Sequence, residues 1–576
     1  MRIKILQIIM NVLLAVIVVD LVYSQVIRGP YYYRLSTNNR IRVVPLEGKR
    51  GRILDRHGVV MADNRVSFDV MVTPQEMKNK EELFLFLSKV LETDQTTLAK
   101  RFQQRRYAPF APVVLAQDIT REQAFVLEEN RFRFPSLIIQ EGYRRFYPMK
   151  DVGSHVLGYV SKISRSRIEK LKDYGYSALS VVGYAGVEES YDQYLKGAEG
   201  GLQIEVNSRG QQVRILGIKE AQSGQDIQLT IDSRIQQFAF EALQGKSGAV
   251  IVMDMDNGEV LGMVSSPSYD PNIFIDAKMN KQTSSLFADS SSPILNRAVK
   301  GLYPPGSVFK IPIAVGALET EKITPQTTFV CRGAFYLGRR QIRCAHTHGA
   351  QNLLEGIAHS CNVYFISTGL KLESDLISKY AKLFGLGQLT RIDLPFEKAG
   401  LIPSQTQRRM LLRQGWYKGD TANLSIGQGD VMVTPIQLLR MITLVGKSGQ
   451  DVQPHVIKAL DSQEVEQQKY ILQRTIPVSE KTFETVRQGI RGTVVDPHGT
   501  ANQLDIAGLI TSGKTGTAQS GGQKKHHAWF VGYTTSQKPD KRRLSFCVFL
   551  EQGGSSYYAV EVTRNLLMKM QSEDIL

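Results

Sequence analysis

Cysteines and long basic runs are both scarce in this chain of 576 residues. Four cysteines are too few for a fold of this length to depend on disulfides. No zinc-finger spacing or long Lys/Arg run is present, so nucleic acid is not an expected partner. Glycine (48) and proline (21) occur at ordinary levels, which excludes collagen-like and Pro/Gly-rich classes. The chain also has no internal repeat and no Gly-x-Ser-x-Gly elbow of a serine hydrolase.

Basic residues outnumber acidic residues in this chain. Lys and Arg number 71 and Asp and Glu number 55, for a net charge of +16. Because the excess is spread thinly, it suits a membrane surface or an anionic polymer rather than one compact anionic ligand.

Long hydrophobic runs are limited to residues 5–27, which contain one charged residue, Asp20. A run of about 20 apolar residues is enough to cross a bilayer. Arg2 and Lys4 precede it and favour a cytoplasmic N-terminus. The alternative is a cleaved signal peptide, but no A-x-A-like site follows. We therefore expect a single-pass anchor with the rest of the chain outside the cytoplasm.

The remaining sequence predicts an α+β protein, because apolar periods of helices and of strands occur in separate stretches. The whole stretch 76–130 is amphipathic and predicted to be helical, with its clearest helical periods at 81–91 and 122–130. Further helices are predicted at 235–243, 302–317, 352–370, 372–384 and 560–570. Strands are predicted at 249–255, 260–265, 509–511, 528–533 and 544–550. Asp256-Asn257-Gly258 joins the first two strands and is a typical hairpin turn.

Ser307 and Lys310 form an S-x-x-K motif that opens an apolar helical run after Pro304-Pro305-Gly306. Residues i and i+3 share a helix face, so the Lys310 amine can reach the Ser307 hydroxyl. A desolvated lysine can serve as the base for a serine nucleophile. A helix cap followed by a solvated lysine is the simpler alternative for the motif alone.

Two further short motifs follow. Ser360 and Asn362 could relay a proton and hold a substrate amide. Lys514-Thr515-Gly516-Thr517 places a cation and hydroxyls on a strand edge, which suits a substrate ending in a carboxylate. Its glycine leaves room for a peptide backbone to pair with that edge.

Residues 508–515 also match the phosphate-binding loop pattern G-x-x-x-x-G-K-[ST]. That loop must open a helix, and the Gly516-Thr517-Ala518 that follows does not begin one. We therefore do not expect nucleotide binding.

Taken in order, S-x-x-K, S-x-N and K-T-G resemble the penicillin-binding proteins and serine β-lactamases. The first half resembles the non-catalytic pedestal of the class B penicillin-binding proteins in three segments, at residues 50–58, 145–148 and 186–188. Residues 427–429 and 434–437 also resemble that class. Residues 303–307 and 416–421 resemble the elongation, rod-shape type more than the division type. The chain has no room for the glycosyltransferase domain of class A.

This resemblance implies an anchor at 1–28, an elongated pedestal domain at 29–235, and a transpeptidase domain at 236–576 with an antiparallel sheet flanked by helices. It implies a peptidoglycan D,D-transpeptidase of the inner membrane that β-lactams inhibit and that needs no cofactor for its chemistry. Implied partners are stem peptides, a polytopic glycan polymerase and other elongation-complex proteins.

The same resemblance implies a role for each motif residue. Ser307 would be acylated and Lys310 would be its base. Ser360 and Asn362 would assist proton transfer and bind the peptide. Lys514, Thr515 and Gly516 would bind the donor end, and the N–H groups of Ser307 and Thr517 would form the oxyanion hole.

Cys331, Cys344, His348 and Cys361 follow the spacing C-x12-C-x3-H-x12-C. Three thiols and an imidazole can hold tetrahedral zinc, although this is no standard finger pattern. Some elongation-type relatives hold zinc beside the S-x-N element, with carboxylates among the ligands. A Cys331–Cys344 disulfide and a ligand role for His346 remain open alternatives. Cys547, in an apolar strand, is predicted to be a core residue.

Three other functions remain open: a division-type transpeptidase, a β-lactamase of the same fold, and a non-catalytic β-lactam sensor or scaffold.

Overall fold

The computed structural model describes residues 2–32, 41–46, 48–106, 111–171, 176, 180–206, 212–276, 279–461, 463–464, 470–522, 524–538 and 540–576. The chain divides into two compact units that interleave along the sequence. Unit 1 contains residues 1–50, 64–144 and 196–224. Unit 2 contains residues 51–63, 145–195 and 225–576.

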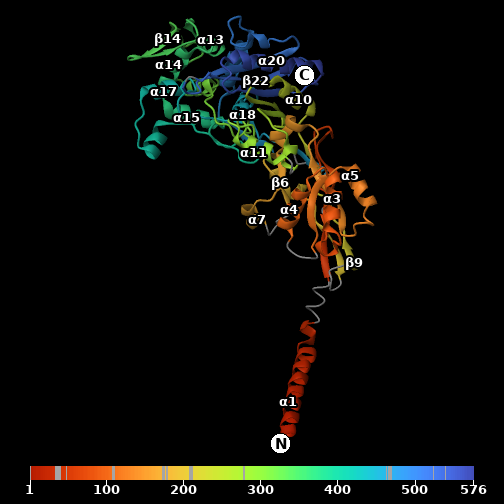
Figure 1. The fold of residues 1–576 in the computed structure, drawn as a ribbon. Helices are drawn as coiled ribbons and strands as arrows, with labels where there is room; N and C mark the ends of the chain where they lie inside the picture. The colour runs from red at the N-terminus through yellow and green to blue at the C-terminus, as the bar shows by residue number, and fades with distance from the viewer. Residues whose placement is uncertain are drawn as a thin grey trace. The chain divides into compact units, whose positions relative to one another are not determined.

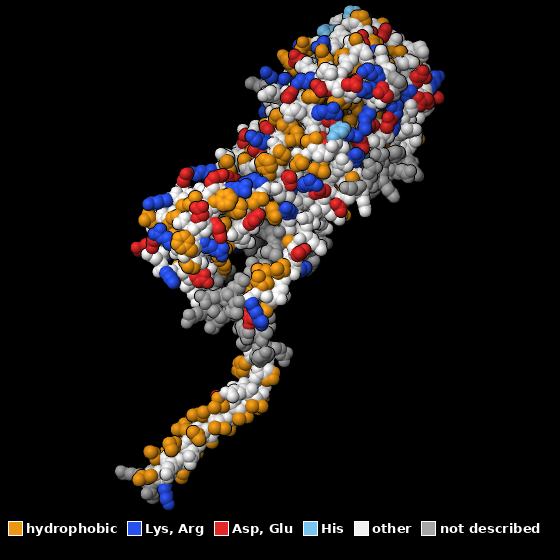
Figure 2. Space-filling view, turned by 90° about the vertical axis from the view of Figure 1, so that its right-hand side faces the viewer, with side chains coloured by type: hydrophobic (Ala, Val, Ile, Leu, Met, Phe, Trp, Pro, Cys, Tyr) orange, Lys and Arg blue, Asp and Glu red, His pale blue; other side chains and the backbone are white. Residues whose placement is uncertain are grey.

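The N-terminal segment is helical, as predicted. Helix α1 (Arg2–Val22) continues into a wider turn, η1 (Tyr23–Ile27). Within the described part of the chain, Ile3–Ile27 is the candidate membrane span, with a mean hydropathy of 2.6 and none of its most apolar window buried. Figure 2 shows hydrophobic side chains along its length. The helix is therefore long and apolar enough to anchor the chain in a membrane.

Unit 1 combines sheets and helices. Strand β3 (Val60–Val72) pairs with β4 (Val113–Ile119) and with β5 (Leu137–Phe146). Leu83, Leu98 and Leu127 belong to its core and lie on α3 (Lys80–Val90), α4 (Gln95–Arg105) and α5 (Arg121–Glu129). A second sheet consists of β1 (Ile41–Leu46), β8 (Gly200–Val206) and β9 (Gln212–Lys219).

The helical prediction for 76–130 is correct for α3, α4 and α5 but wrong for β4. The segment Val113–Ile119 begins with two valines, and its buried residues Val113, Leu115 and Ile119 face the core. Paired β-branched residues favour a strand when a neighbouring strand is available.

Unit 2 contains a five-stranded antiparallel sheet (Figure 1). Its order is β12 (Val260–Ser266), β11 (Gly248–Asp254), β23 (Leu544–Leu550), β22 (His527–Ser536) and β21 (Leu509–Ala518). The predicted hairpin is confirmed as β11–β12, and Gly258 in its turn has φ +84°. Strand β21 is an edge strand, so one side of it is open to other partners.

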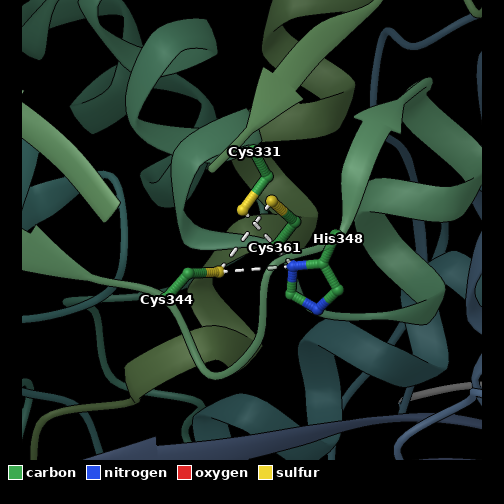
Figure 3. A group of neighbouring side chains, drawn as sticks. All are labelled: Cys331, Cys344, His348 and Cys361. Carbon is green, nitrogen blue, oxygen red and sulfur yellow. Dashed lines mark hydrogen bonds between the residues drawn. The ribbon is translucent and has the colours of Figure 1, made fainter. Parts of the chain in front are cut away.

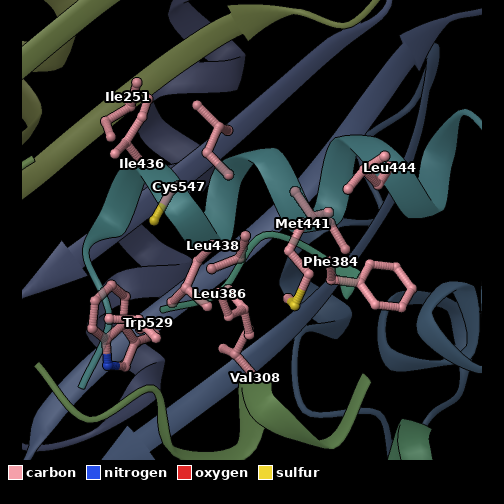
Figure 4. Close-up of a cluster of buried hydrophobic side chains, with 14 of the residues drawn as sticks. Ile251, Val308, Phe384, Leu386, Ile436, Leu438, Met441, Leu444, Trp529 and Cys547 are labelled. Atoms are coloured by element: carbon pink, nitrogen blue, oxygen red, sulfur yellow. The ribbon is translucent and has the colours of Figure 1, made fainter. Parts of the chain in front are cut away.

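Helices cover both faces of this sheet. On one face, α10 (Ser233–Ala242) and α20 (Ser556–Ser572) pack against residues such as Val250, Phe530 and Val548. On the other face lies α18 (Pro435–Gly446), whose Ile436, Leu438, Met441 and Leu444 share a core with Ile251, Trp529 and Cys547 (Figure 4). Cys547 is fully buried, as predicted.

The other elements of unit 2 frame the site or extend the sheets. They are β2 (Ile53–Leu54), α6 (Ser154–Leu157), β6 (Tyr159–Lys162), α7 (Arg165–Leu171), β7 (Val181–Tyr184), α8 (Gly186–Ser190), α9 (Asp192–Leu195), β10 (Ile227–Leu229), α11 (Asn280–Ala288), α12 (Lys310–Glu319), β13 (Phe329–Cys331), β14 (Ala334–Leu337), β15 (Arg340–Arg343), β16 (Gly349–Gln351), α13 (Leu353–Ala358), α14 (Asn362–Leu372), α15 (Ser374–Leu383), α16 (Gln405–Gln407), α17 (Lys418–Leu424), β17 (Gln450–Val452), β18 (Ile457–Leu460), β19 (Gln463–Glu464), β20 (Ile471–Thr475) and α19 (Glu480–Val495).

Candidate active site

Ser307 lies in a tight 3-10 turn, η7 (Gly306–Phe309), that leads directly into α12. Gly306 has φ +56°, and a Cβ atom built on it would lie 2.6 Å from the Thr517 carbonyl oxygen. Only glycine fits this position without displacing β21. The serine is therefore held at the N-terminal end of a buried helix and close to the edge of the sheet.

Two other contacts fix this turn. The Gly306 N–H donates to the Gly427 carbonyl at 3.0 Å. The Trp529 indole N–H donates to the Pro304 carbonyl at 3.1 Å. These bonds attach the loop before Ser307 to the segment 427–429 and to β22, so the position of the serine is set by three separate parts of the fold.

Lys310 is 1% exposed, and its amine points toward the S-x-N element. Its Nζ donates to the Ser360 carbonyl at 2.7 Å and to Asn362 Oδ1 at 2.8 Å, and it lies 3.3 Å from Ser360 Oγ. Burial lowers the pKa of Lys310 to about 8. An appreciable fraction of the lysine is thus neutral near physiological pH, as a base requires.

The S-x-N residues lie at a break between two helices, where the sequence predicts one helix over 352–370. Helix α13 ends at Ala358, and Ser360 adopts φ +57° before α14 begins at Asn362. This conformation costs energy for a residue with a side chain. It turns the Ser360 carbonyl and hydroxyl and the Asn362 amide toward Lys310.

Lys514, Thr515, Gly516 and Thr517 all belong to edge strand β21, in register with Val531, Phe530, Trp529 and Ala528 of β22. Lys514 is fully buried, and burial together with the nearby Lys310 charge lowers its pKa well below the usual value. Thr515 Oγ1 lies 2.6 Å from Thr500 Oγ1. A Cβ on Gly516 would lie 2.9 Å from the Pro305 carbonyl oxygen, so the glycine allows β21 to approach the serine loop.

The structure therefore brings Lys310 into direct contact with Ser360 and Asn362, and places β21 against η7. Among the described residues, no hydrogen bond is formed by the Ser307 hydroxyl, which is half-buried. Residues 508–515 lie in or beside β21, and the strand continues directly to Ala518 where a phosphate-binding loop would open a helix. The phosphate-loop interpretation is thereby excluded.

Cys331, Cys344, His348 and Cys361 converge beside this site (Figure 3). Their ligand atoms all lie within 4.8 Å of one another. Cys344 Sγ is 3.9 Å from Cys361 Sγ, and His348 Nδ1 is 3.5 Å from both Cys331 Sγ and Cys344 Sγ. Zinc–sulfur bonds of about 2.3 Å require tetrahedral edges of roughly 3.8 Å, so the donor set fits zinc.

The surroundings favour a thiolate on one member of the cluster. The interaction with Cys361, together with N–H groups of Asn362 and Val363, lowers the pKa of Cys344, while the same interaction and burial raise the pKa of Cys361. All four cysteines are free thiols, so the alternative Cys331–Cys344 disulfide is not formed. Within the described residues the imidazole of the cluster comes from His348 and not from His346.

Two polar residues at the site have no role in the sequence predictions. Gln428 Nε2 donates to the Thr517 carbonyl at 3.4 Å, and Gln428 Oε1 accepts from the Gln519 N–H at 3.3 Å. Gln428 belongs to a segment quoted only for its resemblance to the family. Thr500, which supports Thr515, lies in no recognisable motif, so no sequence signal could have found it.

Comparison with known proteins agrees with this geometry. A family model described as "Penicillin binding protein transpeptidase domain" matches residues 248–569, and one described as "Penicillin-binding Protein dimerisation domain" matches residues 45–229. The chain is 31% identical to peptidoglycan D,D-transpeptidase MrdA of Escherichia coli K12, over 96% of this chain and 91% of that protein.

Solved structures show the same similarity. One is a complex between the penicillin-binding protein PBP2 and MreC from Helicobacter pylori, with TM-score 0.80, 27% identity and coverage of 93% of this chain and 99% of that one. Another is titled "Structural coordination of polymerization and crosslinking by a peptidoglycan synthase complex", with TM-score 0.75, 29% identity and coverage of 99% and 98%.

Proposed function

Because the chain belongs to the class B penicillin-binding proteins, we propose that it cross-links peptidoglycan stem peptides through an acyl-enzyme on Ser307. It is a peptidoglycan D,D-transpeptidase of the elongation type, in keeping with its near full-length match to MrdA. The observation that carries the residue assignment is Lys310. It is a buried lysine with a lowered pKa, one helical turn after Ser307 and bonded to the S-x-N element.

In the first half-reaction, neutral Lys310 takes the proton of the Ser307 hydroxyl while Oγ attacks the penultimate D-alanine carbonyl. The N–H groups of Ser307 and Thr517 stabilise the resulting oxyanion. The C–N bond to the terminal D-alanine then breaks, and the departing amine receives the proton through Lys310 and Ser360. Free D-alanine and an ester on Ser307 result.

In the second half-reaction, a neutral amine from a neighbouring peptide attacks that ester. The C–N bond forms, the C–Oγ bond breaks, and the proton lost by the amine passes through Lys310 to Ser307 Oγ. The amide cross-link forms and the serine is restored. Asn362 holds Lys310 in place throughout, because its Oδ1 accepts from Nζ.

Lys514 and Thr515 bind the carboxylate of the donor peptide in this proposal. A buried lysine without an anionic partner resists protonation, and the described structure gives Lys514 Nζ a hydrogen bond only to the Thr515 carbonyl, at 3.2 Å. An arriving carboxylate restores its positive charge. Binding of the donor and charging of Lys514 are thus coupled, which favours substrates that end in a carboxylate.

The test is labelling of the membrane-bound protein with a fluorescent penicillin. We expect a stable adduct that Ser307→Ala abolishes, and cross-linking of lipid-linked glycan strands by the wild type. Rapid release of hydrolysed penicillin would favour a β-lactamase instead. An adduct without cross-linking would favour a sensor, and no adduct would contradict every acyl-serine function.

We also propose that Cys331, Cys344, His348 and Cys361 hold a structural Zn²⁺. Bound zinc would keep the thiols as thiolates. It would also connect the end of β13, the segment after β15 and the start of α14. The Asn362 N–H already donates to Cys344 Sγ at 3.2 Å, so this site would brace the residue that positions Lys310. Metal analysis of protein purified without chelator tests the proposal.

For cellular placement, we propose an inner-membrane protein with a cytoplasmic N-terminus and its catalytic domain outside the cytoplasm. Two cations, Arg2 and Lys4, precede the apolar helix and support this orientation. The limits 1–28, 29–235 and 236–576 are our proposal for anchor, pedestal and transpeptidase domains. A polytopic glycan polymerase and elongation-complex proteins are proposed partners. One similar structure is titled as a complex of PBP2 with MreC, and another as a peptidoglycan synthase complex that coordinates polymerization and crosslinking, which supports this proposal.

A further inference from the structure

A short hairpin beside the active site carries an unbalanced positive charge. It consists of β14 (Ala334–Leu337) and β15 (Arg340–Arg343), joined by a turn at Gly338 and Arg339 (Figure 1). Four exposed arginines lie in or next to it: Arg332, Arg339, Arg340 and Arg343. No aspartate or glutamate occurs from Lys322 to Leu354.

These guanidinium groups are also poorly neutralised in space. Among the described residues, their one side-chain hydrogen bond is from Arg340 Nη2 to Asn423 Oδ1, at 3.2 Å. That partner is a neutral amide. A cluster of like charges that forms no ion pair among the described residues destabilises the free protein slightly and favours binding of an anion.

The base of the hairpin touches the catalytic residues. Asn362 Nδ2 donates to the Arg343 carbonyl at 3.0 Å, and Asn362 Oδ1 accepts from Lys310 Nζ at 2.8 Å. One asparagine therefore separates the hairpin backbone from the proposed base. Cys344, the residue directly after β15, belongs to the Cys/His cluster, so the C-terminal end of the hairpin adjoins that cluster.

The tip of the hairpin connects to edge strand β21 through α17 and Gln428. Arg340 binds Asn423, and the Asn423 carbonyl accepts from the Gln428 N–H at 3.0 Å. Gln428 Nε2 in turn donates to the Thr517 carbonyl. Hydrogen bonds thus run from Lys310 through the hairpin and α17 to β21, the strand that carries Lys514.

We propose that this arginine hairpin binds the acceptor peptide and holds its amine toward the ester on Ser307. The inference rests on the proposed function. Lys514 and Thr515 serve the donor carboxylate on β21, so the second peptide must enter from another side. As a stem peptide it also ends in a carboxylate, and it is therefore an acidic ligand. Arginine is well suited to such a ligand, because its planar fork binds a carboxylate through two parallel hydrogen bonds.

The test separates the two half-reactions. The triple variant Arg339→Gln/Arg340→Gln/Arg343→Gln is compared with the triple lysine variant and with Arg564→Gln, an exposed arginine on α20. Acylation of Ser307 by fluorescent penicillin measures the first half-reaction, in which the donor peptide reacts. Aminolysis of a thioester donor is then measured with two acceptors: a stem-type peptide with a free C-terminal carboxylate, and the same peptide as its C-terminal amide.

We expect the glutamine variant to acylate at the wild-type rate and to show an acceptor KM raised roughly tenfold or more for the carboxylate peptide. The amide peptide should be used equally well by all proteins. The lysine variant should recover much of the loss, and raised salt should weaken the wild-type preference for the carboxylate peptide.

Three results would overturn the inference: an unchanged KM, an equal loss with both acceptors, or a parallel loss of penicillin acylation. The first denies the hairpin a binding role, the second denies recognition of charge, and the third assigns the hairpin to the donor half. A wild-type protein that takes no penicillin and forms no cross-link is a different failure, since it contradicts the proposed function itself.

Discussion

Two buried lysines lie near one another in the proposed active site, and their environments differ. Lys310 has three oxygen neighbours from the S-x-N element, whereas Lys514 has only a carbonyl of its own strand. Burial lowers the pKa of both amines, and the Lys310 charge lowers that of Lys514 further. Lys310 is thus suited to exchange a proton, and Lys514 is suited to bind an anion.

The pH dependence of acylation should report Lys310. Its pKa is lowered to about 8, and it accepts the Ser307 proton only when neutral. The second-order rate of penicillin acylation should therefore rise as pH increases through about 8 and level off above it. Stopped-flow labelling between pH 6 and pH 9.5 measures this.

Lys310→Arg provides the control for that profile, because arginine stays protonated at every accessible pH. We expect its acylation rate to be lower by roughly a hundredfold to ten-thousandfold. A wild-type rate that does not change with pH, or an active arginine variant, would show that Lys310 is not the base.

Gly427 is a second residue on which the site depends. A Cβ there would lie 2.1 Å from the Gly306 carbonyl oxygen, whereas one on Gly429 would have its nearest neighbour at 3.7 Å. Both glycines have positive φ, at +66° and +86°. Gly427→Ala should displace the Ser307 turn and slow acylation at least tenfold, while Gly429→Ala shares the backbone strain and should keep most activity. Equal rates in the two variants would contradict a steric role for Gly427.

At the scale of secondary-structure elements, local patterns were sufficient for some parts of the site. The Ser307–Lys310 spacing follows from helix geometry alone, and the Asn257-Gly258 turn predicted its hairpin. The apolar pattern predicts β21 only at 509–511, and the K-T-G motif was separately expected on a strand edge; the strand is continuous from Leu509 to Ala518. The glycines and the lysine of this segment are poor strand formers, and pairing with β22 determines the strand instead.

Other parts of the site depend on contacts between distant segments, which one sequence does not reveal. The break at Ser360 requires a positive φ in a residue with a side chain, and bonds to Lys310 maintain it. The β14–β15 hairpin was not predicted, because its strands are only four residues long. The Cys/His spacing did indicate the cluster that the structure assembles.

The proposed zinc site predicts a linked loss of metal and activity. Cys344→Ser should remove the metal, lower the melting temperature and slow acylation, because Asn362 loses the thiolate that accepts its N–H. Cys547→Ala is the matched control, since Cys547 lies in the sheet core and outside the cluster. Metal content, Tm and penicillin labelling are measured on both proteins. Full activity of Cys344→Ser without bound metal would deny the site a bracing role.

At the scale of the whole molecule, unit 2 is built from segments that are far apart in the sequence. Residues 51–63 and 145–195 group with residues 225–576 and not with their sequence neighbours. Strand β2 pairs in parallel with β10, and Gln236 Nε2 donates to the Val152 carbonyl. The proposed boundary between pedestal and transpeptidase domains at residue 235 is based on the order of motifs along the chain. The compact unit that holds the catalytic motifs also contains residues before that boundary.

Buried polar contacts show what those earlier segments contribute. Arg145 and Glu188 form an ion pair with side chains 2% and 0% exposed, and Arg145 also donates to the Gly51 carbonyl. Asn272 bonds both the N–H and the carbonyl of Tyr147. Removal of one side of such contacts leaves buried groups without partners, which typically costs about 1–3 kcal/mol for each uncharged group.

We therefore predict that a chain beginning at residue 236 does not fold into an active unit, although it retains every proposed catalytic residue. It would leave β18 without its partner strand β10 and Asn272 without the Tyr147 backbone groups that it binds, and several such losses together approach the whole stability of a typical domain. A chain beginning at residue 29 should stay soluble and acylate Ser307 with fluorescent penicillin. Thermal unfolding and labelling of the two purified proteins measure this. Cooperative unfolding with normal labelling of the shorter chain would show that residues 236–576 are a self-sufficient domain and that the interleaved segments add only modest stability.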